Sequence, residues 1–302
     1  MVKNLVLENI SVGFKLPQGV FYAVDDVSLN LPGGNFTAII GESGCGKSVL
    51  GQAILNILPS GVIKKGRVLY NGEQVEKILS AFGIIPQNPS ESLNPVRKIG
   101  KQMQDILDVH QMADSDNSYK KQCLHFFGLQ EADRVLAAYP HELSGGMLQR
   151  VLCAMAVSSK PEWILADEPT KGLDEQVGAV VRKNLLTIKQ DLHLSMLIIT
   201  HDIALAQEVC DDVLVMYAGQ VLEHNADIWH KPLHPYTKGF LQALPKNGLQ
   251  VIPGKAPVPG ESFTGCKFAT RCPYCKTRCK KEVPAMQQVG NAEVRCFLYA
   301  EG

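Results

Sequence analysis

The sequence predicts an α/β protein built around a buried parallel sheet. Two continuous apolar runs, residues 163–166 and 196–199, suit strands covered on both faces, and residues 175–191 between them have the pattern of a crossover helix. A third apolar run, residues 37–40, leads into a glycine-rich turn, and residues 49–58 after the turn have a helical pattern. This order of strand, loop and helix is typical of an α/β core that binds phosphate groups.

The glycine-rich turn, Gly41–Ser48, carries the motif G-x-x-x-x-G-K-S. Its glycines let the backbone curve so that successive N–H groups face a phosphate chain, and the following helix turns its positive end toward the same phosphates. Lys47 is placed to contact the β- and γ-phosphates, and Ser48 to bind Mg²⁺. A chance glycine-rich turn is the alternative, but the strand before it and the helix after it argue against that. We predict a nucleoside triphosphate site at Gly41, Ser43, Gly44, Cys45, Gly46, Lys47, Ser48 and Val49.

The bulk composition limits the class of protein. With 30 basic and 30 acidic residues the formal net charge is zero, so no basic field points to nucleic acid as the main partner. No apolar run approaches the roughly 18–20 residues that a membrane-spanning helix needs, and the first residues lack a signal-peptide core. We therefore expect a cytosolic protein that reaches a membrane only through a partner.

Changes in pattern along the chain predict its organisation. Residues 5–31 alternate apolar and polar positions around a turn at Pro17–Gly19, which indicates antiparallel strands. Residues 88–160 are helical in pattern, residues 213–223 suggest a hairpin, and the chain beyond residue 227 is rich in proline, glycine and cysteine. We predict a β subdomain with the first part of the nucleotide-binding core in residues 1–87, a helical subdomain in 88–160, the second part of the core in 161–226, and a cysteine-rich extension in 227–302.

A second motif lies at the end of the apolar run 163–166. Asp167 and Glu168 follow that predicted strand directly. Asp167 is placed to hold Mg²⁺ through water, and Glu168 to activate the attacking water as a general base. An ordinary pair of acids at a strand end is the alternative, which the phosphate loop upstream makes less favoured.

The segment Leu143–Arg150, with the sequence LSGGMLQR, resembles the signature motif of ATP-binding-cassette (ABC) ATPases. Met147 stands where glutamine is usual, as in a variant found in oligopeptide and nickel importers. The resemblance covers essentially the whole chain and implies a RecA-like ATPase core with an antiparallel β subdomain and a helical subdomain. The order of motifs fits that family: the phosphate loop, Gln87, the signature, Asp167-Glu168, Leu173-Asp174 and His201.

The resemblance implies roles for residues outside the phosphate loop. Phe14 would stack on the adenine, with Tyr22 as a weaker candidate and core packing as the alternative for both. Gln87 would sense Mg²⁺ and the attacking water. His201 would contact the γ-phosphate in the transition state.

The signature also implies a second chain. Asp174 would lie at a dimer seam, where Lys171–Gly172 departs from the smaller residues usual in the family. The signature residues precede a helical pattern at residues 147–157, so they place free N–H groups at the positive end of a helix. In the family this tip grips the γ-phosphate of ATP bound to the opposite subunit; here it consists of Ser144, Gly145 and Gly146.

The C-terminal region looks like the tail of oligopeptide, dipeptide and nickel importer ATPases, in residues 230–237, 252–254 and 265–273. Four of its cysteines match a set that is similar to [4Fe–4S] ligands in some members, namely Cys266, Cys272, Cys279 and Cys296. Thiolates at these spacings suit such a cluster or Zn²⁺, and free thiols or disulfides are the remaining alternatives. Cys275 forms a Cys-x-x-Cys with Cys272 and leaves the ligand assignment open.

The resemblance implies the ATP-binding and ATP-hydrolysing subunit of an importer for oligopeptides, dipeptides or nickel, peripheral to the cytoplasmic face of the cell membrane. Its partners would be an identical or related ATPase subunit, a permease that contacts residues 88–100, and indirectly an extracytoplasmic solute-binding protein. One alternative is a soluble ABC ATPase that acts on nucleic acid or ribosomes, which the lack of a coiled coil and of a basic stripe disfavours. Another is a module that no longer hydrolyses ATP, which the intact Lys47, Glu168 and His201 disfavour. The sequence leaves open the cargo and the choice between homodimer and heterodimer.

Overall fold

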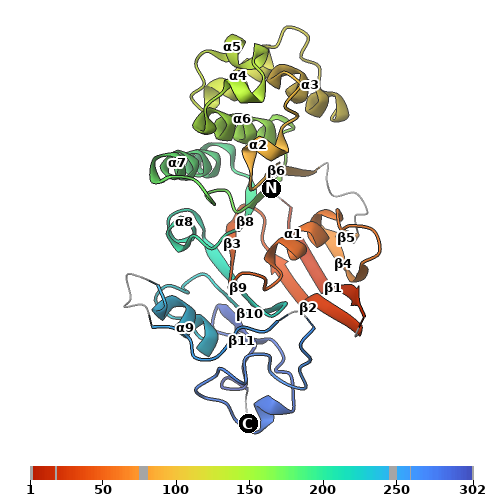
Figure 1. The fold of residues 1–302 in the computed structure, drawn as a ribbon, viewed down its shortest axis with the longest axis vertical. Coiled ribbons are helices and arrows are strands. Elements are labelled where there is room, and N and C mark those ends of the chain that lie inside the picture. The colour runs from red at the N-terminus through yellow and green to blue at the C-terminus, as the bar shows by residue number, and fades with distance from the viewer. Residues whose placement is uncertain (1–2, 18, 75–80, 245–249, 259, 301–302) are drawn as a thin grey trace. The chain divides into compact units, whose positions relative to one another are not determined.

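The computed structural model describes residues 3–300 except residues 18, 75–80, 245–249 and 259 (Figure 1). Contacts divide the chain into two compact units. The first contains residues 33–36 and 77–209, and the second contains residues 4–32, 37–76 and 210–302. The predicted boundaries at residues 87, 160 and 226 fall inside these units and stay predictions about smaller subdomains.

Three parallel strands form the sheet of the first unit, in the order β6 (Phe82–Ile85), β7 (Trp163–Asp167) and β8 (Ser195–Ile199). All of β8 and the first four residues of β7 are buried, as strands covered on both faces must be. The crossover between β7 and β8 is α7 (Glu175–Leu192), and α8 (Ile203–Val209) follows β8. The two predicted buried strands and the crossover helix are therefore confirmed.

The remainder of the first unit is helical, as predicted. Helix α6 is its centre: residues 151–158 are all buried, and α3 and α4 pack against it (Figure 1). A short 3₁₀ turn at Pro140–Glu142 precedes α6. The helices are α2 (Pro89–Ser92), α3 (Ile99–Val109), α4 (Ser118–Phe126), α5 (Ala132–Ala137) and α6 (Gly145–Ser158).

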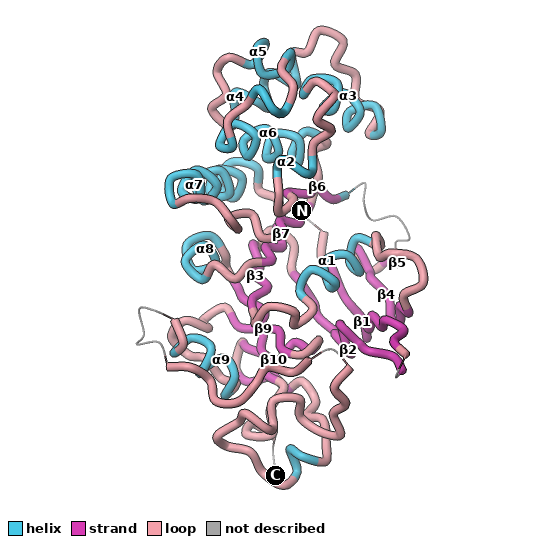
Figure 2. Tube along the Cα trace, viewed as in Figure 1, coloured by secondary structure: helices cyan, strands magenta, loops and turns pink. Residues whose placement is uncertain are grey.

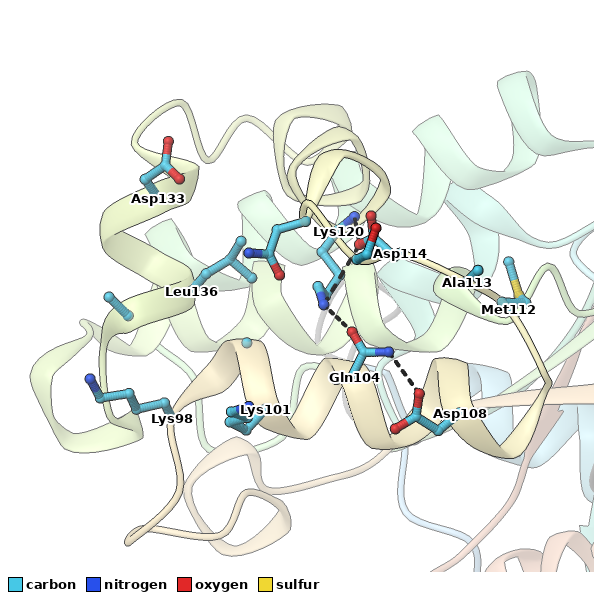
Figure 3. Close-up of a pocket in the computed structure, with 14 residues that line it drawn as sticks. Lys98, Lys101, Gln104, Asp108, Met112, Ala113, Asp114, Lys120, Asp133 and Leu136 are labelled. Carbon is cyan, nitrogen blue, oxygen red and sulfur yellow. Dashed lines mark hydrogen bonds and ion pairs between the residues drawn. The ribbon is translucent and has the colours of Figure 1, made fainter.

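A buried polar network joins α3 to the start of α4, beside a cavity of about 680 Å³ (Figure 3). The Lys120 ammonium lies 3.7 Å from the Asp114 carboxylate, and these side chains are only 3% and 1% exposed. Asp114 also accepts the backbone N–H groups of Tyr119 and Lys120, both at 3.0 Å. Lys120 contacts Gln104 of α3, which donates to Asp108 at 2.7 Å. Because a buried charge is destabilising without its partner, this network fixes α4 against α3.

An antiparallel sheet of four strands forms part of the second unit, in the order β2-β1-β4-β5. It confirms the predicted β subdomain, and Leu5 at its start pairs with Leu31 at its end. Its strands are β1 (Leu5–Leu16), β2 (Gly19–Leu31), β4 (Ile63–Tyr70) and β5 (Glu73–Gln74).

A second group of strands in the same unit carries the phosphate loop. Strand β3 (Phe36–Ile40) runs parallel to β9 (Asp212–Tyr217), and β9 pairs antiparallel with β10 (Gln220–Asn225). The turn between β9 and β10 has positive φ at Ala218 and Gly219 (47° and 84°), which is typical of the predicted tight hairpin. Helix α1 (Lys47–Leu55) follows β3 and ends three residues before the predicted end at Leu58, with the left-handed Asn56 as its C-cap.

The C-terminal region is mostly loop but returns to the strands of the second unit (Figure 2). It contains α9 (Pro235–Gln242), a 3₁₀ turn at Arg278–Lys280, and the hairpin of β11 (Gln287–Val289) and β12 (Ala292–Val294). Strand β12 pairs with β10, so the end of the chain extends the sheet. Within the described part of the chain, no helix combines the length and the apolar character that crossing a bilayer requires.

His224 joins three strands of this sheet and makes their packing sensitive to pH. Its imidazole on β10 lies 3.6 Å from the Asp212 carboxylate on β9 and 3.3 Å from the Glu293 carboxylate on β12. Burial opposes the charged imidazole, but the two carboxylates outweigh this and raise the pKa of His224 to about 9 from its ordinary 6.5. The protonated ring therefore stabilises the folded chain fully below pH 6.5, and that contribution is lost as the pH rises through about 9.

We expect the stability difference between the wild type and His224→Gln to shrink by about 3 kcal/mol between about pH 6 and about pH 9.5. Urea denaturation of both chains at the two pH values measures this difference. Equal differences at both pH values would show that His224 does not titrate in this range.

Candidate active site

The phosphate loop connects β3 to α1 in the second unit, and two of its glycines are required by geometry. Gly41 and Gly46 have φ of 150° and 105°. A Cβ at Gly41 would lie 2.2 Å from the carbonyl oxygen of Met216, and one at Gly46 would lie 2.1 Å from that of Ala23. Only glycine allows the loop to pass this close to the neighbouring strands.

Lys47 is held inside the curve of this loop. Its side chain is buried, and its ammonium donates to the carbonyl oxygens of Gly41 (2.9 Å) and Glu42 (3.1 Å). Helix α1 begins after Gly46 without a side-chain cap, so its positive end faces the loop. An ammonium group beside such a helix start is an arrangement that binds phosphate. Cys45 is buried next to Lys47, and burial raises the pKa of its thiol although Lys47 opposes this.

Glu168 and His201 form a hydrogen-bonded pair in the first unit. The Glu168 carboxylate lies 2.6 Å from Nδ1 of His201 and accepts the His201 backbone N–H at 3.3 Å. Glu168 has a left-handed backbone with φ of 48°, and its N–H donates to the carbonyl oxygen of Ile199 at 2.8 Å. Such strain in a non-glycine residue is concentrated at functional sites. The structure thus brings the predicted general base and the predicted γ-phosphate contact together.

Gln87 and Asp167 lie at the same edge of the first unit's sheet. Gln87 is exposed just beyond β6, and Asp167 is the last residue of β7. These strands are adjacent and parallel, with Ile85 opposite Ala166. In α/β proteins the carboxyl ends of such strands are where ligands bind.

The signature residues lie at the start of α6. The Ser144 hydroxyl accepts the backbone N–H of Met147 at 3.3 Å and caps the helix. Gly145 and Gly146 face open space, since a Cβ at either position would meet no atom within 4 Å. Asp174 likewise caps α7 and is exposed. The tip of α6 is therefore accessible to a ligand from another molecule.

The two candidate adenine contacts differ in their surroundings. Phe14 of β1 is half-buried and lies opposite Phe21 of β2. Tyr22 lines a cavity of about 330 Å³ together with Gly44 of the phosphate loop and Gly219, and Phe14 is not part of its lining. This geometry favours Tyr22, the weaker candidate in the sequence, although both assignments stay predictions.

Two residues that contact the phosphate loop were not predicted. A guanidinium nitrogen of Arg271 donates to both carboxylate oxygens of Glu42, at 3.1 and 3.0 Å, and the Tyr236 hydroxyl accepts the Glu42 backbone N–H at 3.1 Å. Both come from the C-terminal region, and no motif links them to a loop so far away in the sequence. Both lie within tail segments that resemble importer ATPases, residues 230–237 and 265–273, but that resemblance gave no sign of a contact with the loop.

The cysteines of the tail are free thiols, with no disulfide among the nine cysteines of the chain. Within the described residues, no three His, Cys, Asp or Glu side chains form a group that holds a metal ion. Burial nevertheless raises the pKa of the thiols of Cys266, Cys272 and Cys296, and interaction with Cys279 adds to the rise for each of the three. The predicted ligand set is thus gathered in one region without the geometry of a single-ion site.

We expect Glu168→Gln to lower ATP hydrolysis by about a hundredfold or more, because the amide cannot accept a proton from water. ATP binding should persist, and the bound nucleotide should trap a dimer that gel filtration detects. Glu175→Gln is the matched control, because Glu175 is an exposed acid in the first turn of α7. Wild-type phosphate release by Glu168→Gln would contradict the assignment of the base.

Comparisons with known proteins agree with this geometry. The profile of the family "ABC transporter" matches residues 24–171, and that of the family "Oligopeptide/dipeptide transporter, C-terminal region" matches residues 222–279. Among solved structures, the dimeric bacterial ABC transporter cassette MJ0796 has a TM-score of 0.62 and 26% identity, covering 72% of this chain and 96% of that one. MJ0796 in a post-hydrolysis state bound to ADP and phosphate gives a TM-score of 0.61 at 25% identity, covering 73% of this chain and 97% of that one.

Curated relatives extend the match to nearly the full chain. The oligopeptide transport ATP-binding protein OppD of Haemophilus influenzae is 34% identical over 98% of both chains. The dipeptide transport ATP-binding protein DppD of Escherichia coli is 35% identical over 95% of this chain and 94% of its own length. The chain therefore belongs to the ABC transporter ATPases, in the group of the oligopeptide and dipeptide transport ATP-binding proteins.

Proposed function

We propose that this ATPase powers the import of oligopeptides or dipeptides through a membrane permease. The observation that carries the proposal is the match of residues 222–279, in the C-terminal region, to the profile described for oligopeptide and dipeptide transporters. The relatives are named for oligopeptides and dipeptides, which favours peptides over nickel as cargo. These relatives are transport proteins, which argues against the alternative of an ATPase that acts on nucleic acid or ribosomes.

ATP with Mg²⁺ is the expected cofactor of an ABC ATPase, and the residues present fit it. The buried Lys47 at an uncapped helix start suits the β- and γ-phosphates, and Ser48 and Asp167 offer oxygen ligands for Mg²⁺. Glu168 is the general base for water, and its bond to His201 orients both side chains. Gln87 at the end of β6 is the remaining polar contact to the attacking water.

A second ATPase subunit, identical or related, completes each site. Ser144 and Gly145 are exposed at the positive end of α6, where backbone N–H groups suit an anion. The γ-phosphate of ATP bound to the facing subunit is such an anion, and the related cassette MJ0796 is a dimer. Hydrolysis removes the shared phosphate and lets the subunits separate.

The permease contacts a groove of about 480 Å³ in the first unit. Its apolar lining includes Ile84 of β6, Ile106 of α3 and Met155 of α6. Arg97 and Asp105, which are joined by two hydrogen bonds of 2.6 and 3.0 Å, add a polar side. Such a groove suits a short amphipathic helix from the permease, and it includes part of the predicted contact region 88–100. The ATPase would then lie on the cytoplasmic face, with the solute-binding protein reached only through the permease.

We expect Ile84→Lys to lower peptide uptake roughly tenfold or more, since it places a charge in an apolar groove. The measurement is uptake of labelled peptide into vesicles that contain the permease and both ATPase subunits, with sedimentation to follow binding to the membrane. Val109→Lys is the control, because Val109 is 79% exposed on α3 and outside the groove lining. Uptake of nickel without uptake of peptide would contradict the proposed cargo.

The tail cysteines hold a metal cofactor in this proposal, a [4Fe–4S] cluster with zinc as the alternative. The thiols of Cys266, Cys272 and Cys296 accept hydrogen bonds from the backbone N–H groups of Phe268, Tyr274 and Leu298, respectively. These bonds lower the pKa of the thiols, whereas burial raises it. The Lys276 N–H donates to the Cys279 sulfur at 3.4 Å. Such N–H···S bonds stabilise thiolate ligands, and a cluster needs its thiols farther apart than one ion does. The cofactor would stabilise a region poor in secondary structure, and Cys275 is a substitute ligand.

Protein purified without oxygen should contain about four iron and four sulfide per chain and absorb visible light. Cys266→Ser should lose most of this iron, whereas Cys210→Ser, outside the tail, should keep it. Iron, acid-labile sulfide and zinc analysis measures this. One zinc and no iron would select the alternative, and no metal would refute the site.

A further inference from the structure

The second residue of the phosphate loop carries a negative charge that the loop itself does not neutralise. Glu42 follows Gly41, in a loop whose chemistry is the binding of a polyanion. A carboxylate beside a triphosphate repels it, the more so where burial reduces screening by water. The Glu42 side chain is only 24% exposed. Its charge therefore needs a partner if ATP is to bind well.

That partner comes from the C-terminal tail. Nη1 of Arg271 donates to Oε1 and Oε2 of Glu42 at 3.1 and 3.0 Å, and the Arg271 side chain is only 6% exposed. Charge-assisted bonds to a guanidinium hold a carboxylate more firmly than neutral bonds do. The Glu42 carboxylate is thus turned toward the tail.

Contacts other than the one with Glu42 also hold the Arg271 side chain in place. Its Nε donates to the carbonyl oxygen of Pro253 at 3.1 Å, and Nη1 lies 3.3 Å from the Tyr217 hydroxyl. Its guanidinium also lies 5.7 Å from the centre of the Tyr217 ring and 6.0 Å from that of Phe268. These contacts fix the guanidinium against aromatic faces and leave few alternative positions for it.

The backbone at Glu42 is anchored in the same direction. The Glu42 N–H donates to the Tyr236 hydroxyl of α9 at 3.1 Å, and its carbonyl oxygen accepts from Lys47 at 3.1 Å. The Tyr217, Tyr236 and Phe268 rings contact one another behind these groups, with centroids 4.6 to 5.4 Å apart. The first turn of the loop therefore lies against a support formed by α9 and the tail.

We propose that Arg271 is a positioning residue of the ATP site: it neutralises Glu42 and holds that carboxylate against the tail, so that the loop accepts the triphosphate. The C-terminal region then sets the affinity for ATP in addition to any role in metal binding. This inference concerns the ATPase reaction and does not depend on which cargo the importer carries.

The test is the ATPase kinetics of Arg271→Gln, Glu42→Gln and the double variant. Arg271→Gln leaves the carboxylate unpaired near the phosphates, so its KM for ATP should rise about tenfold with a smaller change in kcat. Glu42→Gln removes the repelling charge together with the bond, so its KM should change little. The double variant should behave like Glu42→Gln alone, because the second change removes the charge that the first exposed.

Two further variants separate this role from general support of the fold. Arg271→Lys keeps the charge and should recover part of the affinity. Arg278→Gln is the matched control in the tail, because Arg278 pairs with the exposed Glu282 and should leave KM unchanged. If Arg271→Gln does not fold, Arg271→Lys gives the comparison at smaller amplitude: its KM should rise only in part, and adding Glu42→Gln should remove that rise. A wild-type KM for Arg271→Gln, or a double variant as impaired as Arg271→Gln alone, would overturn the proposal.

Discussion

The structure depends on one constraint: a loop of backbone N–H groups and a buried ammonium must stay in shape while a polyanion enters and leaves. Gly41 and Gly46 meet this constraint by letting the loop touch the neighbouring carbonyl groups of Met216 and Ala23. Lys47 meets it by resting on the carbonyl oxygens of the loop, which spares a buried cation from being unpaired. The surrounding strands and α9 hold these atoms of the loop in position.

The residues predicted to act on the phosphate lie in the other unit and are held in place by a different means. Glu168 is held in a left-handed conformation by its bond to Ile199, and its side chain is oriented by His201. The two residues are separated in sequence by α7 and β8, and a parallel crossover brings their strand ends to one edge. The phosphate loop and the predicted base thus have separate structural supports.

Sequence patterns predicted the parts of this protein that follow from local chemistry. The buried strands, the crossover helix, the β9–β10 hairpin and the helical region are apparent because apolar periodicity and turn residues act over short distances. Contacts such as Arg271 with Glu42 or Lys120 with Asp114 escaped prediction, because a charged residue in sequence gives no sign of being buried. The preference for Tyr22 over Phe14 at the cavity also required knowing which strand faces the loop.

The pairing of β12 with β10 has a consequence for how the chain is made. The phosphate loop is synthesised early, yet the arginine that pairs with Glu42 and the strand that pairs with β10 follow much later in the sequence. Until then β10 offers an open edge, to which other strands can add. A chain in synthesis therefore keeps this edge open, and Glu42 without its arginine partner, until residues 271–294 have been made.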